Sequence, residues 1–350
     1  MSASVFDHPF LSGLLGDEET AAYFSADADI RAMLAFEAAL AKAEAAHGII
    51  PVGAAAAIAG ACSSFAPDLA ALRNATARDG VVVPELVRQL RAAAGDAGAH
   101  VHIGATSQDV IDSSLMLRLK PVAYLFAGRL VAIDAHLTAL EASFGNLPMM
   151  GRTRMQAAIP ITVADRLRAW RSPLEGYRET LTELRFPLQF GGAAGTLEKF
   201  GDKAGAVRAS LAQELGLTDL PQWQSQRAVV AEFAGLLSLI NGSLGKFGQD
   251  IALMAQAGDE IALSGGGASS AMAHKQNPVA AETLVALARF NATQLSAIHH
   301  SMIHEQERSG AAWTLEWMVL PQMAAACGAA LRLAQDLVGN IRRLGPPQLK

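Results

Sequence analysis

The chain has 350 residues, which is enough for two or three domains. A net charge of -5 and a pI near 6.0 give no electrostatic reason to expect a nucleic-acid partner. No uninterrupted apolar run is long enough to span a bilayer, and the first residues lack the pattern of a signal peptide. Cys62 and Cys327 do not make a disulfide framework and indicate a reducing compartment, so we expect a cytoplasmic protein.

The composition also predicts subunit contacts. Hydrophobic residues make up 51% of the chain and charged residues only 17%. Because a monomer has limited room for apolar surface, part of it is expected at interfaces between subunits.

Residues 1–104 are expected to form an N-terminal helical domain, and residues 105–350 a central domain of long helices. Ser25 and Asp27 can cap a helix over about residues 29–47, which Gly48 and Pro51 end. Its buried side is predicted to carry Met33, Leu34, Phe36, Ala39 and Leu40. A second helix follows Pro84, with Leu86, Val87 and Leu90 facing inward. No alternation long enough for a sheet appears.

The segment over residues 100–109 precedes a strong helical pattern. Thr106 or Ser107 can cap that helix, which leaves free N–H groups and a positive dipole end for a carboxylate or phosphate. The alternative is an ordinary helix cap with Gln108 as a polar neighbour. His100 and His102 have no carboxylate or cysteine at metal-ligand spacing, and a buried structural histidine is the alternative for either.

Long helical patterns fill most of the remaining chain, over residues 109–144, 225–261, 279–304 and 318–344. Pro121 is expected to kink the first of them. The second has a three-four apolar seam of Val230, Phe233, Leu237, Ile240, Leu244, Phe247, Ile251 and Met254. On its other faces lie Gly235, Gly242, Gly245 and Gly248, which predict close approach of neighbouring helices.

Residues 151–160 interrupt the helices and carry Arg152, Arg154 and Gln156 between a glycine and a proline. A guanidinium stays charged at any working pH and can hold a carboxylate with two hydrogen bonds, although it cannot shuttle protons. The alternative is a solvated turn. The glycine-rich residues 190–196 lack the strand and helix context of a dinucleotide loop.

Residues 264–278 are a donor-rich loop between two helices. Three consecutive glycines make its backbone free to move, and Pro278 can open the next helix. Such a loop suits a lid that closes on an anion, whereas its Gly-Ser composition alone also suits a flexible linker. The fixed offsets of its polar residues favour a site; these residues are Ser269, Ser270, Met272, Lys275 and Asn277.

His299, His300 and His304 raise the alternative of a zinc site. His300 and His304 lie one helical turn apart, but the sequence shows no third ligand at a suitable spacing from this pair. Arg308 adds a second permanent cation. We therefore predict a site without metal or cofactor.

The loop over residues 264–278 resembles the signature loop of the fumarase/aspartase superfamily, Gly-Ser-Ser-x-Met-Pro-x-Lys-x-Asn-Pro, with Ala273 in place of that family's first proline. Residues 106–109 and 151–160 resemble two further regions of that superfamily, and residues 30–45 and 304–321 its 3-carboxy-cis,cis-muconate cycloisomerase branch. The likeness extends from about residue 6 to about residue 320. It implies an all-α fold with a long central bundle. In this superfamily the central helices of four identical subunits pack together, and each active site is built from several subunits. The superfamily also has a small C-terminal helical domain, which is expected to be largely absent here.

The resemblance also implies roles. The residues predicted to bind substrate are His102, Thr106, Ser107, Gln108, Arg152, Arg154, Gln156, Ser270, Met272 and Arg308. Ser269 is expected to move the proton beside a substrate carboxylate, while Lys275 and Asn277 stabilise the aci-carboxylate intermediate. The lyases carry an acid histidine at the position of Arg154; an arginine there suits lactonisation, in which the substrate's own carboxylate attacks. The expected reaction is conversion of 3-carboxy-cis,cis-muconate to 4-carboxymuconolactone in protocatechuate catabolism. The alternatives are a fumarate-releasing lyase of the adenylosuccinate or argininosuccinate type, and a non-catalytic helical assembly.

Overall fold

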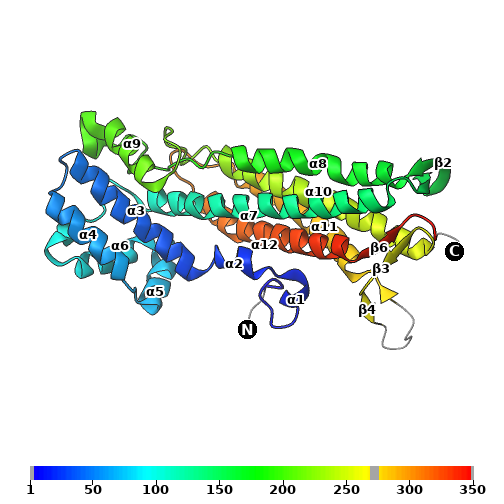
Figure 1. Cartoon of the computed structure of the whole chain (residues 1–350). Helices are drawn as coiled ribbons and strands as arrows, with labels where there is room; N and C mark the ends of the chain where they lie inside the picture. The colour runs from blue at the N-terminus through cyan, green and yellow to red at the C-terminus, as the bar shows by residue number, and fades with distance from the viewer. Residues whose placement is uncertain (1–3, 269–275, 348–350) are drawn as a thin grey trace.

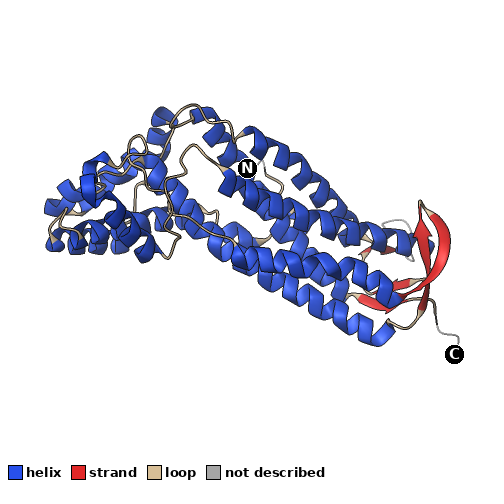
Figure 2. Ribbon diagram, turned by 90° about the horizontal axis from the view of Figure 1, so that it is seen from above, coloured by secondary structure: helices blue, strands red, loops and turns tan. Residues whose placement is uncertain are grey.

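The protein is an elongated bundle of long helices with short helices at one end and short strands at the other (Figures 1 and 2). The computed structural model describes residues 4–268 and 276–347. The predicted all-α class with a central bundle of long helices is confirmed.

The N-terminal part contains only short and medium helices. They are α1 (Ser12–Leu15), α2 (Glu18–Ala22), α3 (Ala26–Ala46), α4 (Val52–Ser64), α5 (Leu69–Asp79), α6 (Val83–Ala93) and the 3-10 helix η1 (Gly95–His100). Ser25 caps α3, because its hydroxyl accepts a hydrogen bond of 3.2 Å from the Ala28 N–H, whereas Asp27 lies in the first turn. The residues predicted to face inward on α3 and α6 are buried.

These short helices are not separate from the rest of the chain. Helix α3 packs against α4, against α7 and against the later helix α9 (Ala204–Leu215), which follows the 3-10 helix η2 (Glu198–Lys203). Helices α1 and α2 pack along α12 of the central bundle. The division of the chain at residue 104 stays a prediction.

Five long helices make the bundle: α7 (Ser107–Phe144), α8 (Val163–Glu183), α10 (Ala228–Ala257), α11 (Val279–His300) and α12 (Gly310–Gly339). Helix α10 packs against α8, α11 and α12, and α7 packs against α8 and α12. All eight residues of the predicted α10 seam are buried. Helix α7 continues as one helix through Pro121.

Two glycines of α10 allow its close contact with α11. A Cβ on Gly245 would lie 2.5 Å from Ala288 Cβ, and one on Gly248 would lie 2.6 Å from the Ala281 carbonyl oxygen. Both distances are too short for real contacts, so these positions need glycine. Gly235 and Gly242 have no atom within 4 Å of such a Cβ, so this chain alone does not explain them.

Four predicted helix limits were wrong. Helix α10 ends at Ala257 rather than near residue 261, because Gly258 adopts a left-handed φ of 83°. Helix α11 ends at His300 rather than near residue 304. Helix α12 begins at Gly310 rather than near residue 318, because Ser309 caps it and Pro321 is accommodated inside it. The same helix ends at Gly339 rather than near residue 344.

Short strands pair at the end of the bundle opposite the N-terminal helices (Figure 2). Antiparallel pairs join β1 (Pro148–Thr153) to β2 (Gln156–Thr162), β3 (Ile261–Leu263) to β6 (Ile341–Leu344), and β4 (Gly267–Ala268) to β5 (Gln276–Asn277). The sequence did not predict them, since each strand is too short to show a clear alternation.

Three bundle helices, α7, α10 and α12, are long and apolar enough to cross a membrane, judged by length and composition alone; the bent pair α4 and α5 would make a fourth. This differs from the expectation based on uninterrupted apolar runs. The contacts of these helices with one another in the bundle account for much of their apolar composition.

Candidate active site

Thr106, one of the two predicted caps, is the N-cap of α7. The Thr106 N–H donates a 2.9 Å hydrogen bond to Asp109 Oδ2, and the two residues form a reciprocal capping box. Asp109 Oδ1 also accepts from the Gln189 side chain at 3.1 Å and the Gly191 N–H at 2.8 Å, and Oδ2 accepts from the Gly192 N–H at 3.0 Å. One buried carboxylate thus fixes the glycine-rich segment against the start of α7.

The surroundings of Asp109 shift its pKa. Burial raises its pKa to about 6, although the hydrogen bonds from backbone and side-chain N–H groups favour the charged form. With a pKa of about 6, this carboxyl group changes its protonation state just below neutral pH.

Gln108 and Arg308 meet at this helix start. Arg308 Nε donates to Gln108 Oε1 at 3.0 Å, and its Nη2 lies 3.4 Å from the Ala193 carbonyl oxygen, while the residue remains exposed. Gln108 is buried and donates from Nε2 to the Gln224 carbonyl at 2.7 Å. The structure thus brings together two residues that are 200 positions apart in the chain; both were predicted to bind substrate.

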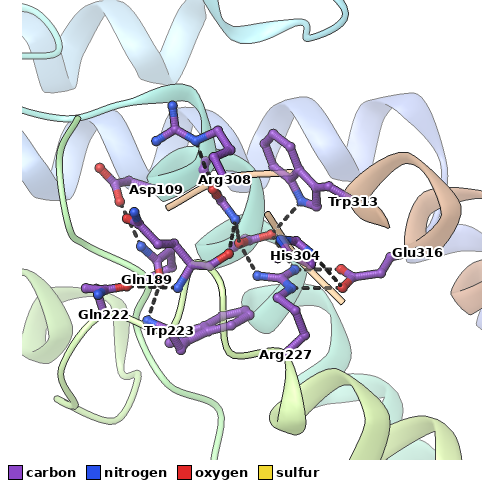
Figure 3. A network of polar contacts seen from close by, with 12 residues as sticks. Asp109, Gln189, Gln222, Trp223, Arg227, His304, Arg308, Trp313 and Glu316 are labelled. Atoms are coloured by element: carbon purple, nitrogen blue, oxygen red, sulfur yellow. Dashed lines mark hydrogen bonds and ion pairs between the residues drawn. The ribbon is translucent and has the colours of Figure 1, made fainter. Parts of the chain in front are cut away.

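Behind them lies a buried charge network centred on Arg227 (Figure 3). Its guanidinium donates to both oxygens of Asp112, at 2.6 and 3.0 Å, and to both oxygens of Glu316, at 2.8 and 2.6 Å. It also lies 4.5 Å from the centre of the Trp223 ring. Burial would lower the pKa of Arg227, but the two carboxylates outweigh it and raise that pKa.

This network is connected to Gln108 and to the segment around His304. Gln108 Nε2 donates to Asp112 Oδ2 at 3.1 Å, and the Trp313 indole donates to Asp112 Oδ1 at 3.0 Å. The His304 ring is fully buried, with Nε2 3.7 Å from Glu316 Oε1. Within residues 4–268 and 276–347, no three His, Cys, Asp or Glu side chains gather as metal ligands.

His102 is held by a carboxylate from α3. Its Nδ1 donates to Glu37 Oε1 at 2.6 Å, and the residue has a left-handed φ of 63°. Burial would lower the pKa of His102, but the charge of Glu37, its hydrogen bond and the Asp109 charge together outweigh burial and raise that pKa. The pair fixes the ring orientation, since Nδ1 is committed to Glu37 and Nε2 is left for another partner.

Arg152, Arg154 and Gln156 lie on the β1–β2 hairpin at the far end of the bundle. Thr153 pairs with Gln156, so Arg154 and Met155 form a two-residue turn, with φ angles of 50° and 67°. Such turns usually contain glycine or asparagine because both positions need positive φ. All these side chains are exposed. Arg152 Nη2 lies 4.0 Å from Oε2 of Glu260, the residue directly before β3.

Asn277 lies at the same far end, in β5, opposite Gly267 of β4. It lines a cavity of about 560 Å³ together with Ser264, Gly265, Gly266 and the ends of α10 and α12. The other predicted loop residues lie outside the described residues; they are Ser269, Ser270, Met272 and Lys275.

The predicted site residues therefore form two groups within one chain. His102, Thr106, Ser107, Gln108 and Arg308 lie near the start of α7, whereas the hairpin arginines, Gln156 and Asn277 lie beyond its other end (Figure 1). Helix α7 has 38 residues, which corresponds to roughly 55 Å. One protomer does not bring the two groups together.

Several residues of the first group were missed by the sequence analysis. Asp109 had a local signal, since Thr-x-x-Asp before a helix marks a capping box. Glu37, Asp112, Arg227 and Glu316 had none, because their partners come from distant segments.

Comparisons with known proteins show the family of this chain. A lyase family model matches residues 15–290, and the chain belongs to this family. A 3-carboxy-cis,cis-muconate cycloisomerase of Pseudomonas aeruginosa is 42% identical over 333 residues, which cover 91% of this chain and 72% of that protein. The crystal structure of the 3-carboxy-cis,cis-muconate lactonizing enzyme from Pseudomonas putida has a TM-score of 0.89 at 37% identity, covering 95% of this chain and 77% of that one.

A more distant relative is the N-acetyl-S-(2-succino)cysteine lyase of Enterococcus italicus, 34% identical, with 98% of this chain and 77% of that protein covered. The predicted resemblance to the cycloisomerase branch of the fumarase/aspartase superfamily is confirmed.

Proposed function

We propose that this chain is an enzyme that closes 3-carboxy-cis,cis-muconate into 4-carboxymuconolactone. The observation that carries the proposal is the 42% identity, over 91% of the chain, to a protein named as this cycloisomerase. Arg154 adds a physical reason. An arginine suits a reaction in which a carboxylate attacks, because that nucleophile needs orientation and no acid on a leaving group.

The reaction needs one new C–O bond and one proton. A carboxylate oxygen of the substrate bonds to an alkene carbon, the alkene electron pair moves onto the neighbouring carboxylate, and a proton then adds to the carbon between them. Lys275 and Asn277 are proposed to stabilise the aci-carboxylate intermediate, and Ser269 to deliver the proton. The helix start at Thr106 and Ser107, with Arg308, is proposed to bind a second carboxylate.

We propose that the site is shared between subunits of a homotetramer that works in the cytoplasm on a small polycarboxylate. The separation of roughly 55 Å along α7 supports this, because the substrate is far shorter. An antiparallel neighbour would place its hairpin beside the α7 start of the first subunit. The open faces at Gly235 and Gly242 of α10 are compatible with a neighbouring helix there.

The direct test is incubation with 3-carboxy-cis,cis-muconate, with loss of diene absorbance followed in time and the product identified by NMR. Conversion to the lactone is expected. A second arm uses N-acetyl-S-(2-succino)cysteine, adenylosuccinate and argininosuccinate, because a relative at 34% identity is named as a lyase. Fumarate release with no lactone formation would replace the proposal with the lyase alternative; inactivity in every arm would favour a non-catalytic assembly.

Sharing of the site is tested by mixing two inactive variants, Arg154→Ala and Arg308→Ala, through joint unfolding and refolding. If each site takes these residues from different subunits, roughly a quarter of the sites in an equal random mixture regain both. If both residues serve a site from the same subunit, the mixture stays inactive. Refolded wild type mixed with the double variant is the matched control, with roughly a quarter of sites active in the first case and half in the second.

A further inference from the structure

A separate cavity lies between the N-terminal helices and the bundle. It has a volume of about 260 Å³ and is formed by α3, α5, α7 and α12, together with the segments before α3 and α6. Its walls are mainly apolar and include Phe24, Met33, Leu115, Trp317, Leu320 and Pro321. Cavities between structural units, with apolar walls and few polar groups, are where small molecules commonly bind.

Most polar groups in this wall are already paired. The Thr76 hydroxyl donates to the Leu72 carbonyl at 2.8 Å. Both oxygens of Glu316 accept hydrogen bonds from Arg227. A ligand therefore finds little new hydrogen bonding at these two positions.

Arg118 is the exception. Its side chain is only 12% exposed, yet its Nε and Nη1 each donate one long bond of 3.3 Å, to the carbonyls of Ser114 and Tyr23. A guanidinium has five N–H donors, so some remain for a ligand. Its charge partner is Asp29, with Oδ1 2.7 Å from Nη2. Burial lowers the pKa of Arg118, and the Asp29 charge only partly offsets this.

Asp29 is a replaceable partner. Its side chain is 47% exposed, so it can turn into water at little cost when another anion approaches Arg118. Phe24 lies beside the same guanidinium, with its ring centre 5.9 Å from Cζ. A flat ligand that carries an anionic group would thus meet an aromatic wall and a buried cation together.

We propose that this cavity binds a small monocarboxylic acid with a flat apolar body, whose carboxylate takes the place of Asp29 on Arg118. The volume is sufficient, since an apolar cavity of about 150 Å³ in another protein accepts benzene. The site is distinct from both groups of predicted active-site residues and does not depend on the proposed reaction.

Benzoate is the probe, and its binding to the full chain is measured by isothermal titration calorimetry. A ligand of this size is expected to bind with a Kd on the order of 1 mM. Benzamide, which has the same shape without the charge, should bind at least about tenfold more weakly. Propane-1,2,3-tricarboxylate at saturation should leave benzoate binding unchanged, because it competes only at a polycarboxylate site.

Two variants locate the site. Arg118→Gln is expected to weaken benzoate binding about tenfold or more. Asp29→Asn is expected to tighten it several-fold, because the competing carboxylate is gone. Asp27→Asn is the matched control: it removes the same charge from the same helix turn, at an exposed position outside the cavity, and should leave the affinity unchanged.

The proposal is overturned if benzoate shows no binding, binds no better than benzamide, or is displaced by the tricarboxylate. It is also overturned if Asp29→Asn behaves like Asp27→Asn. Since that variant keeps the buried arginine, this comparison decides the question even if Arg118→Gln does not fold.

Discussion

Glu44 on α3 gives a prediction of stability that follows directly from its surroundings. Its side chain is fully buried, and neither carboxylate oxygen has a hydrogen-bond partner. Burial, and then the charge of Glu37, raise its pKa from 4.5 to about 8. The substitution Glu44→Gln keeps the shape and removes the charge that this site disfavours.

The sign follows from proton linkage. The folded state holds the Glu44 proton up to about pH 8, whereas the unfolded chain loses it near pH 4.5, so the free energy of unfolding falls as the pH rises between these values. Integrating this relation from pH 5 to pH 8 gives a loss of roughly 3–4 kcal/mol in the native chain. The Glu44→Gln variant does not undergo this loss. Its free energy of unfolding, relative to that of the native chain, should therefore rise by the same amount between pH 5 and pH 8.

The assay is urea unfolding followed by circular dichroism at pH 5, 6, 7 and 8, at one fixed protein concentration. Glu183→Gln, at an exposed position at the end of α8, is the control and should follow the native chain at each pH. If the difference between Glu44→Gln and the native chain is the same at pH 5 and pH 8, the carboxyl group is not held protonated and the reasoning is refuted.

Three further predictions concern the candidate site. Arg308→Lys keeps the charge but loses the planar donor to Gln108, so KM for the tricarboxylate should rise roughly tenfold while urea unfolding is unchanged. Glu37→Gln removes the charge that raises the pKa of His102, so the pKa read from the ring resonances by NMR should fall; an unchanged value would contradict that cause. Arg154→His, at the exposed hairpin tip, should lower kcat on the order of a hundredfold with no effect on unfolding, and unchanged turnover would remove Arg154 from the mechanism.

The sequence predicted the long helices well because their signal is local and repeated. The α10 seam recurs every three or four residues, so its buried face could be assigned without knowing its partners. The start of α12 was predicted too late, near residue 318, whereas the helix begins at Gly310 and carries Pro321 in its interior. A proline in a helix interior is tolerated when tertiary packing compensates for the lost hydrogen bond, and α12 is among the most buried helices of the described chain.

The hairpin tip shows a different limit of sequence reasoning. The arginines were identified, but nothing in the residues indicated that Arg154 and Met155 both adopt positive φ, which such side chains rarely do. The strand pairing on either side imposes this conformation. Strain of this kind is tolerated where the surrounding structure determines it, and such positions often belong to functional sites.

The buried network of Arg227 explains why the α7 end can act as a fixed half of a site. The Arg227 guanidinium pairs with Asp112 of α7 and with Glu316 of α12, and Asp112 also accepts from Gln108. Removing Arg227 would leave two buried carboxylates without their cation, and breaking a buried ion pair in this way costs about 3–5 kcal/mol. The orientation of Gln108, and through it of Arg308, is therefore set before any ligand arrives. Preorganised donors of this kind lose little freedom on binding a carboxylate. In the proposed shared site, this end is therefore expected to bind the substrate, with the exposed hairpin coming from another subunit.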